Sequence, residues 1–451
     1  MGDNYQLPRW DTVQSRRSTN HRQPSDRKDF GIGILCALTL EADAVFAVFD
    51  DTWDMNEYGK ASNDINAYTA GRIGNHNVIL AHLPGMGKSS AASVATGLRH
   101  SFPNIRLCLV VGICGGVPTH LETDDEILLG DVIISKGMVE YDFGRQLPNG
   151  VARKDAPGDN LCRPSEELRA FFQKIEGVHA RQKLQKNTHL HLNEICGKEY
   201  FEKSKYPGAT EDKLYQSSYR HKHQDSPDCD VCAKCESDDH DTCNKALDLS
   251  CPQLKCDDGE LVSRKRLSSR EGPQIHFGRF ASGDLVMKSG SHRDNIAIKE
   301  NVIAFEMEGA GVWERFPSVV VNKAVCDYAD SHKNKKWQGY AAASAAACTK
   351  AFLEEWIVAD TGRRPSETSQ SQSEEPSPIT KIATSSTIDS KSQTMSRTPE
   401  EEEITKVVTS SPTNSKSQTI PRATPIPITV EEPRPVTAST NSKVCTFPFV
   451  L

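Results

Sequence analysis

Residues 30–38 read FGIGILCAL, and this stretch decides the fold. It is apolar without polar alternation, which is typical of a strand covered on both faces. The runs LCLVVG at 107–112 and GDVIIS at 130–135 repeat the pattern. Helical spacing at 42–49 and 89–99 separates these strands. The sequence therefore predicts an α/β domain with a mostly parallel or mixed sheet and helices on both faces.

The domain is expected to span residues 30–360, with an interruption. Between about residues 177 and 273 the apolar periodicity fades, and we expect a Cys-rich, partly ordered insertion. Residues 1–29 and 361–451 are too polar to offset chain entropy by burial, so we expect a disordered arm and a disordered low-complexity tail. The other expected elements are strands at 67–73, 78–83, 275–282, 302–304 and 319–325, and helices at 305–315 and 340–357.

Composition excludes several classes of protein. Only 37% of the 451 residues are hydrophobic, and the formal net charge is -7. An acidic balance gives no reason to expect a nucleic acid or a membrane as partner. The first 29 residues lack the apolar core of a signal peptide, so we expect a cytoplasmic protein. Most of the 14 cysteines are then reduced thiols, and those inside apolar runs behave as small hydrophobic residues.

Four groups of short motifs stand out. They are GILCALTLE at 33–41, GMGK at 85–88, VGICGG at 111–116, and the pair FEMEGA at 305–310 with AVCDYAD at 324–330. In this order and spacing they resemble the nucleoside phosphorylase superfamily, and the acidic positions look closest to its adenosylhomocysteine and methylthioadenosine nucleosidase branch. The resemblance covers roughly residues 30–356. It implies a three-layer phosphorylase/hydrolase-like fold, with a mixed central sheet flanked by helices.

Cleavage of an N-glycosidic bond needs an acid at the base, negative charge at the sugar and a nucleophile beneath it. Asp327 follows an apolar strand, at a carboxyl end where open α/β sheets place ligands. It can protonate a purine ring nitrogen if burial raises its pKa. The alternative is an aspartate that caps the next helix.

The resemblance assigns the sugar to Glu308, which would accept hydrogen bonds from the ribose hydroxyls, with Met307 packed beside it. Glu306 points to a different side and is a secondary candidate. Its alternative role is a carboxylate favoured by the dipole at a helix N-terminus.

Glu41 bears on the type of reaction. The hydrolytic branch carries a glutamate here that orients and deprotonates water; the alternative is an ordinary carboxylate in a first helical turn. No arginine occurs in residues 30–71, and Ile113 and Cys114 stand where a phosphate-supporting Ser or Thr is common. Hydrolysis is therefore favoured over phosphorolysis, with Arg72 and Arg99 as the remaining candidate phosphate ligands.

Backbone atoms complete the expected pocket. Gly112 and Gly115, with Ile113 and Cys114, allow close approach of a ligand, although either glycine also suits a plain tight turn. The segment ASGD at 281–284 resembles the purine-side loop of the family, with base contacts at Gly283, Val286 and Met287. An aromatic residue that often stacks on the purine is matched by Val286, which leaves the base preference open.

Two other motifs resemble a phosphate loop and a zinc site. GMGKS at 85–89 lacks the first glycine of a phosphate loop, since His82 occupies that position, so we expect no nucleotide triphosphatase. Cys229, Cys232 and Cys235 have the spacing of zinc ligands, and six further candidates lie nearby: Cys243, Cys251, Cys256, His221, His223 and His240. A complete pair of Cys-x2-Cys pairs is absent. The alternatives are a structural zinc or a flexible acidic loop with free thiols.

The sequence thus predicts a purine nucleosidase acting on an adenosine-like nucleoside, with no catalytic metal and with water or inorganic phosphate as co-substrate. The alternatives are a phosphate-dependent phosphorylase and a catalytically inactive module that senses nucleosides or binds a partner. The resemblance also implies a homo-oligomer.

Overall fold

The computed structural model describes residues 23–148, 150–156, 158–225, 229–235 and 240–357. These residues belong to one unit, which ends at residue 365. The predicted tail and most of the predicted arm lie outside the described residues. At residues 27–29, which were assigned to the arm, a 3-10 helix (Arg27–Asp29) forms because Asp26 caps it.

A nine-stranded mixed sheet forms the core, in the order β10-β9-β6-β11-β5-β1-β4-β3-β2. β10 also pairs with β5, so that β5, β11, β6, β9 and β10 close into a ring of strands. The strands are β1 (Ile32–Cys36), β2 (Asp51–Trp53), β3 (Ala67–Ile73), β4 (His76–His82), β5 (Leu107–Gly116), β6 (Val132–Glu140), β9 (Ile275–Ser282), β10 (Ala304–Glu306) and β11 (Ser318–Asp327).

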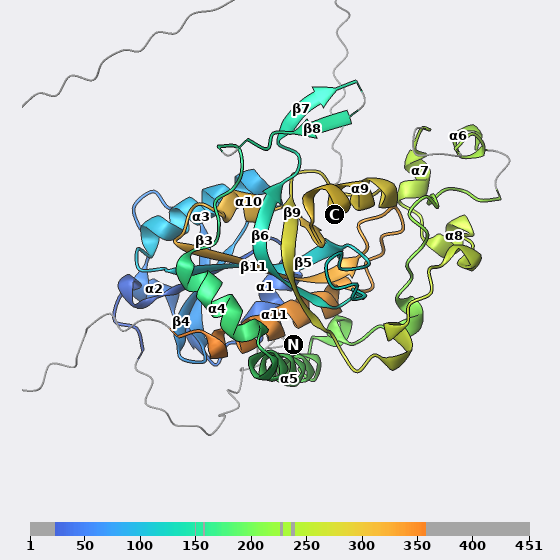
Figure 1. Ribbon diagram of the computed structural model, residues 1–451. Coiled ribbons are helices and arrows are strands. Elements are labelled where there is room, and N and C mark those ends of the chain that lie inside the picture. Colours follow the sequence, from blue (N-terminus) through green and yellow to red (C-terminus); the bar gives the residue numbers. More distant parts are fainter. Residues whose placement is uncertain (1–22, 149, 157, 226–228, 236–239, 358–451) are drawn as a thin grey trace, which may run out of the picture. The chain divides into compact units, whose positions relative to one another are not determined.

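Helices cover both faces of this sheet (Figure 1), as the sequence predicts. α11 packs on β5 and β11 together with α1 and α5, while α3 and α10 pack together on the other side. The helices are α1 (Thr39–Phe46), α2 (Met55–Tyr58), α3 (Lys88–Ser101), α4 (Glu166–Glu176), α5 (Val178–Cys196), α9 (Gly290–Glu300), α10 (Gly309–Val312) and α11 (Gln338–Glu355). The alanines of α11 are buried, which lets this helix lie close to the strands.

Strand directions explain why the apolar runs lack alternation. β1 is parallel to both β4 and β5, β5 is parallel to β11, and all five residues of β1 are buried. A strand in the middle of a parallel region is covered on both faces and therefore reads as a continuous apolar run. β6 runs antiparallel to β11, which makes the sheet mixed.

Two predicted elements need correction. The expected helix at 305–315 begins only at Gly309, because Phe305 and Glu306 pair with β9 and Phe305 also pairs with β5. The insertion was expected to begin at residue 177, but α5 packs against α11 as part of the core, with Leu184 and Leu192 buried. The sequence analysis also missed α4 and the hairpin of β7 (Gly144–Leu147) and β8 (Gly150–Arg153).

The rest of the insertion is built of short elements. They are the 3-10 helices Glu202–Ser204, Ala209–Glu211, Asp258–Glu260 and Arg266–Ser269, and the four-residue helices α6 (Asp230–Ala233), α7 (Asn244–Leu247) and α8 (Cys251–Leu254).

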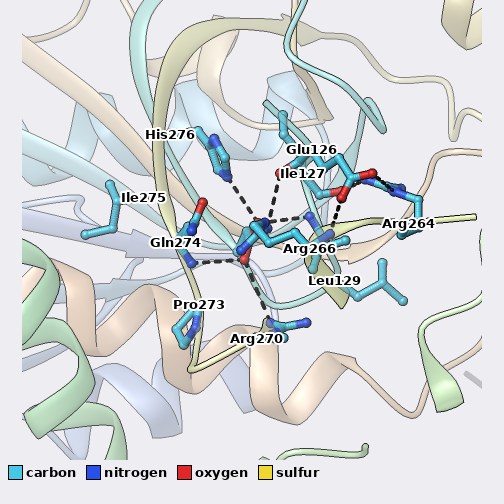
Figure 2. Close-up of polar contacts among 12 residues, drawn as sticks. Glu126, Ile127, Leu129, Arg264, Arg266, Arg270, Pro273, Gln274, Ile275 and His276 are labelled. Atoms are coloured by element: carbon cyan, nitrogen blue, oxygen red, sulfur yellow. Dashed lines mark hydrogen bonds and ion pairs between the residues drawn. The ribbon is translucent and has the colours of Figure 1, made fainter. Parts of the chain in front are cut away.

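A buried cluster of charges ties the end of the insertion to the sheet (Figure 2). Asp131, at the start of β6, accepts hydrogen bonds from the backbone N–H groups of Leu128 and Gln274, both at 2.9 Å. His276 Nε2 lies 3.1 Å from its carboxylate, Arg266 pairs with it, and Arg270 lies 3.8 Å away. We call Asp131, Arg266, Arg270 and His276 the Asp131 cluster.

Candidate active site

The predicted acidic residues Glu41 and Asp327 follow or end neighbouring strands of the sheet, on either side of β5. Glu41 lies in the first turn of α1, directly after β1, and Asp327 is the last residue of β11. In the parallel pairing of β5 with β11, Gly112 lies opposite Lys323 and Gly115 lies opposite Asp327. Neighbouring parallel strands present their carboxyl ends at one edge of a sheet, so side chains far apart in the chain converge there.

Glu41 is 2% exposed and fixed by backbone donors. One carboxylate oxygen accepts the N–H groups of Ala37 and Leu38 at 2.9 Å, and the other accepts the N–H of Ile113 at 2.8 Å. A Cβ at Gly112 would overlap this carboxylate, so this glycine makes room for Glu41. Glu41 is thus a first-turn carboxylate that also reaches across to β5.

Burial raises the pKa of Glu41. The positive charge of Lys323 acts against this shift and the negative charge of Glu308 adds to it, and the net direction is upward. A carboxylate whose pKa moves toward neutrality is a stronger base for water than an ordinary surface glutamate.

A buried lysine that the sequence analysis missed lies beside Glu308 and Glu306. Lys323, on β11, is 3% exposed, and its Nζ lies 2.6 Å from Glu308 and 3.4 Å from Glu306. Burial alone would lower the pKa of Lys323, but Glu308, Glu306 and Glu41 outweigh it and hold the pKa above its usual range. Glu308 also accepts the N–H of Gly87 at 3.3 Å, and Met307 beside it is partly exposed.

Glu306 and Glu308 have different roles. The Glu306 carboxylate accepts the backbone N–H groups of Glu308 at 3.0 Å and of Gly309 at 2.9 Å, where α10 begins. These contacts agree with the alternative role of Glu306 as a carboxylate at a helix N-terminus, although Glu306 itself lies in β10. It leaves Glu308 as the carboxylate that faces Lys323 and Gly87.

Asp327 forms an ion pair with a second lysine that sequence reasoning missed. Its Oδ1 lies 2.6 Å from Lys333 Nζ and accepts the N–H of Ala329 at 2.9 Å. Its Oδ2 lies 3.3 Å from Cys326 Sγ. Asp327 does not cap a helix, since the next helix, α11, begins at Gln338. We call Glu41, Glu308, Asp327, Lys323 and Lys333 the carboxylate site.

The predicted pocket residues on β5 line this site. Ile113 supplies the N–H that fixes Glu41, and a Cβ at Gly115 would lie 3.1 Å from Asp327 Oδ1. Cys114 is buried, and burial raises the pKa of its thiol above the usual range. The thiol is therefore protonated at neutral pH and is not a nucleophile.

The predicted base loop follows β9. Gly283 donates its N–H to the carbonyl of Glu306 at 3.1 Å, which ties the loop to the sugar side of the site. Val286 is 50% exposed, and Met287 packs beside a small apolar cluster that includes Phe305.

The cationic groups suggested for phosphate are engaged elsewhere. Lys88 Nζ lies 2.6 Å from both Glu140 and Asp142, so the GMGKS segment faces carboxylates. Arg72 pairs with Asp51 at the β2–β3 edge, and Arg99 donates to the carbonyl of Arg315 at 2.7 Å.

Comparisons with known proteins show which family part of the chain matches. Residues 31–192 match the model of the phosphorylase superfamily. The chain is 31% identical over 339 residues to a nucleotide-binding leucine-rich repeat (NLR)-like protein of Hyaloscypha variabilis, with 74% of this chain and 30% of that protein aligned. The chain therefore spans about a third of the length of this relative.

The chain is also similar to solved structures of a nucleosidase and of a hydrolase. The 5'-methylthioadenosine/S-adenosyl homocysteine nucleosidase of Helicobacter pylori is 15% identical, with 73% of this chain and 99% of that chain covered and a TM-score of 0.43. The futalosine hydrolase of the same species is 16% identical, with the same shares covered and a TM-score of 0.41. Within the described residues, no helix combines the length and apolar character needed to cross a membrane.

Proposed function

We propose that the protein hydrolyses the N-glycosidic bond of a purine nucleoside, since residues 31–192 match the model of the phosphorylase superfamily. The observation that carries the proposal is the convergence of Glu41, Glu308 and Asp327 at one edge of the sheet. Carboxylates that line one site attract the positive charge that develops on the ribose.

In the proposed reaction Glu41 takes a proton from a water molecule, whose oxygen forms a bond to the anomeric carbon. The bond between this carbon and the purine nitrogen breaks, and its electron pair leaves with the base. Asp327, protonated from solvent before this step, delivers its proton to the departing purine. Glu41 then returns the proton that it took to solvent, and the products are free base and ribose. Lys333, 2.6 Å from Asp327, stabilises negative charge at that side.

Hydrolysis is preferred to phosphorolysis because Lys88, Arg72 and Arg99 are held by other groups. A phosphorylase needs cations or backbone donors that are free to bind phosphate. The N–H of Ile113, a backbone donor in the pocket, is already used by Glu41.

A second candidate function is nucleoside sensing without turnover. It is favoured by the relative from Hyaloscypha variabilis, which is an NLR-like protein of which this chain spans only part. Such a module would bind a nucleoside through the same residues and leave the glycosidic bond intact.

One experiment separates the candidates. Purified protein is incubated with adenosine, guanosine and inosine, with and without phosphate, and free base is measured by chromatography. We expect base release without phosphate. Release that requires phosphate would identify a phosphorylase, and binding without release would identify a sensor.

A further inference from the structure

The Cys- and His-rich part of the insertion brings four ligand-type side chains to one point. They are His223, Cys229, Cys232 and Cys243, and their ligand atoms all lie within 4.8 Å of one another. Nδ1 of His223 lies 3.3 Å from Cys232 Sγ and 3.9 Å from Cys243 Sγ. Cys243 Sγ lies 3.7 Å from Cys229 Sγ. Cys235, which the sequence spacing suggested, lies outside this group.

These separations match the edges of a zinc tetrahedron. Zinc binds thiolate at about 2.3 Å and imidazole nitrogen at about 2.0 Å, so tetrahedral angles place two sulfurs about 3.8 Å apart, and sulfur and nitrogen about 3.5 Å apart. A disulfide would bring two sulfurs to about 2.0 Å. All four groups thus lie where one ion can contact them together, and thiolates with imidazole favour zinc.

The surroundings favour a bound cation with thiolate ligands. The backbone N–H of His223 lies 3.4 Å from Cys232 Sγ, as expected for a donor to a metal-bound thiolate. Three thiolates around a divalent ion leave one net negative charge. The ammonium of Lys222 lies 3.3 Å from the backbone carbonyl of Cys232 and 2.5 Å from that of Cys235. This positive charge therefore lies beside the four ligand-type side chains.

The described residues of this part of the chain bury few apolar side chains. Among the described residues of 217–262, the buried hydrophobic side chains are Cys232, Cys235, Ala246 and Leu254. Its helices α6, α7 and α8 have four residues each. Small elements of this kind usually depend on a metal or a disulfide for stability. We propose that His223, Cys229, Cys232 and Cys243 bind a structural zinc ion.

A separate observation carries a second site two residues away. His221 Nδ1 lies 3.7 Å from Cys251 Sγ and 3.6 Å from Cys256 Sγ. Its Nε2 lies 2.7 Å from the carbonyl of Leu249, a bond that fixes Nε2 as the donor and leaves the Nδ1 lone pair free for a metal. We infer that His221, Cys251 and Cys256 bind a second zinc ion, with water as the fourth ligand.

The second site contacts the segment that carries Asp327 and Lys333. The N–H of His221 donates to Ser331 Oγ at 3.3 Å, and the ring of His332 lies edge-on to that of His221 at 5.1 Å. Tyr215 stacks on His332 at 4.2 Å. The zinc-bound insertion is therefore a support for one wall of the carboxylate site.

The test is the metal content of the full-length protein, purified without chelators and measured by mass spectrometry. We expect two zinc ions per chain. Cys243→Ser should remove one and Cys251→Ser the other, while the matched control Cys235→Ser should keep both. Loss of zinc in Cys235→Ser with retention in Cys243→Ser would overturn the first site. One ion per chain that is insensitive to Cys251→Ser would overturn the second.

A measurement on the unmutated protein tests both sites even if the variants fail to fold. Cobalt exchanged for zinc should give the intense visible absorption of tetrahedral cobalt, with thiolate charge-transfer bands. Treatment with a thiol-modifying mercurial should release the metal to a colorimetric chelator. A weak octahedral spectrum, or protein that neither retains nor takes up metal, would overturn both sites.

Discussion

Two clusters of buried charge flank the end of β11, and they use their carboxylates differently. On the β6 side, the Asp131 cluster surrounds one carboxylate with two arginines, a histidine and two backbone donors. On the β5 side, the carboxylate site shares two lysines among three carboxylates. The first cluster saturates its acidic group, whereas the second keeps a surplus of negative charge.

We propose that this difference separates a structural cluster from a catalytic one. A buried carboxylate whose acceptors are all used stabilises only the fold that places its partners. A site with surplus carboxylates is costly to build, but the surplus charge is then free to stabilise a cation such as a developing ribosyl oxocarbenium ion. The balance of charge, more than burial, therefore indicates which cluster carries the chemistry.

The largest expected effect is on turnover. Glu41→Gln keeps the size of the side chain but removes the base, and general base catalysis contributes about 10²–10⁴-fold, so kcat should fall by that factor. The measurement is the rate of purine release at saturating nucleoside. Asp43→Asn is the matched control, because Asp43 is exposed two residues away on α1. Equal rates for Glu41→Gln and the unmutated protein would remove Glu41 from the mechanism.

The next effect is on stability. Lys323→Met leaves Glu308 and Glu306 without their buried partner, and loss of one partner of a buried ion pair costs about 3–5 kcal/mol. The free energy of unfolding in urea measures this. Lys333→Met should cost less, since the Lys333 side chain is 24% exposed. A larger loss of unfolding free energy for Lys333→Met than for Lys323→Met would contradict the role of Lys323 as the buried partner of Glu308 and Glu306.

A smaller effect concerns pH. Burial alone would raise the pKa of Asp131, but His276, Arg266 and Arg270 outweigh it and lower the pKa. A carboxyl group with a lowered folded pKa stabilises the protein above its unfolded pKa of about 3.9, and this stability is lost as pH falls through the folded value.

We therefore expect the Asp131 cluster to lose about 1.5–3 kcal/mol below about pH 4, the range for hydrogen bonds to charged groups. Unfolding free energies measured from pH 6 to pH 2 would show it. Asp131→Asn should lack this acid-dependent part, while Asp43→Asn should retain it. Identical acid dependence in both variants would argue against an ionised Asp131.

The smallest expected effect is on KM, and it tests whether the purine lies beside Val286. Val286→Phe places a ring where the resembling family often stacks on the purine, and aromatic stacking contributes about 0.5–1.5 kcal/mol. KM for adenosine should fall by up to about tenfold with little change in kcat. Leu285→Phe, which adds the same ring at an exposed neighbouring position, should leave KM unchanged. The opposite ranking would place the base elsewhere.

The sequence predicted the acidic members of the site because each follows a recognisable apolar strand or motif. Glu41 follows β1, and Asp327 ends β11. Their meeting depends on strand order, in which β1 and β11 both lie beside β5, and no local pattern in the chain encodes that order.

Each feature that the sequence did not predict has its own physical reason. A lysine is usually a surface residue, so Lys323 and Lys333 drew no attention, although a charge inside the apolar run VVVNKAV was itself unusual. Cys243 and His223 were recognised as nearby candidate ligands, but the sequence does not pair them, because Cys243 lies well beyond the closely spaced cysteines and only folding brings it to His223. The three-residue β10 is too short for periodicity to distinguish it from the start of a helix.

The most direct test of the carboxylate site follows adenosine by proton NMR in phosphate-free buffer, with the unmutated protein and with Asp327→Asn. We predict that the unmutated protein converts adenosine to adenine and ribose, and that Asp327→Asn is slower by at least about 10²-fold. Unchanged adenosine with the unmutated protein, or equal rates for the two proteins, would contradict the proposal that this cluster of carboxylates cleaves the glycosidic bond.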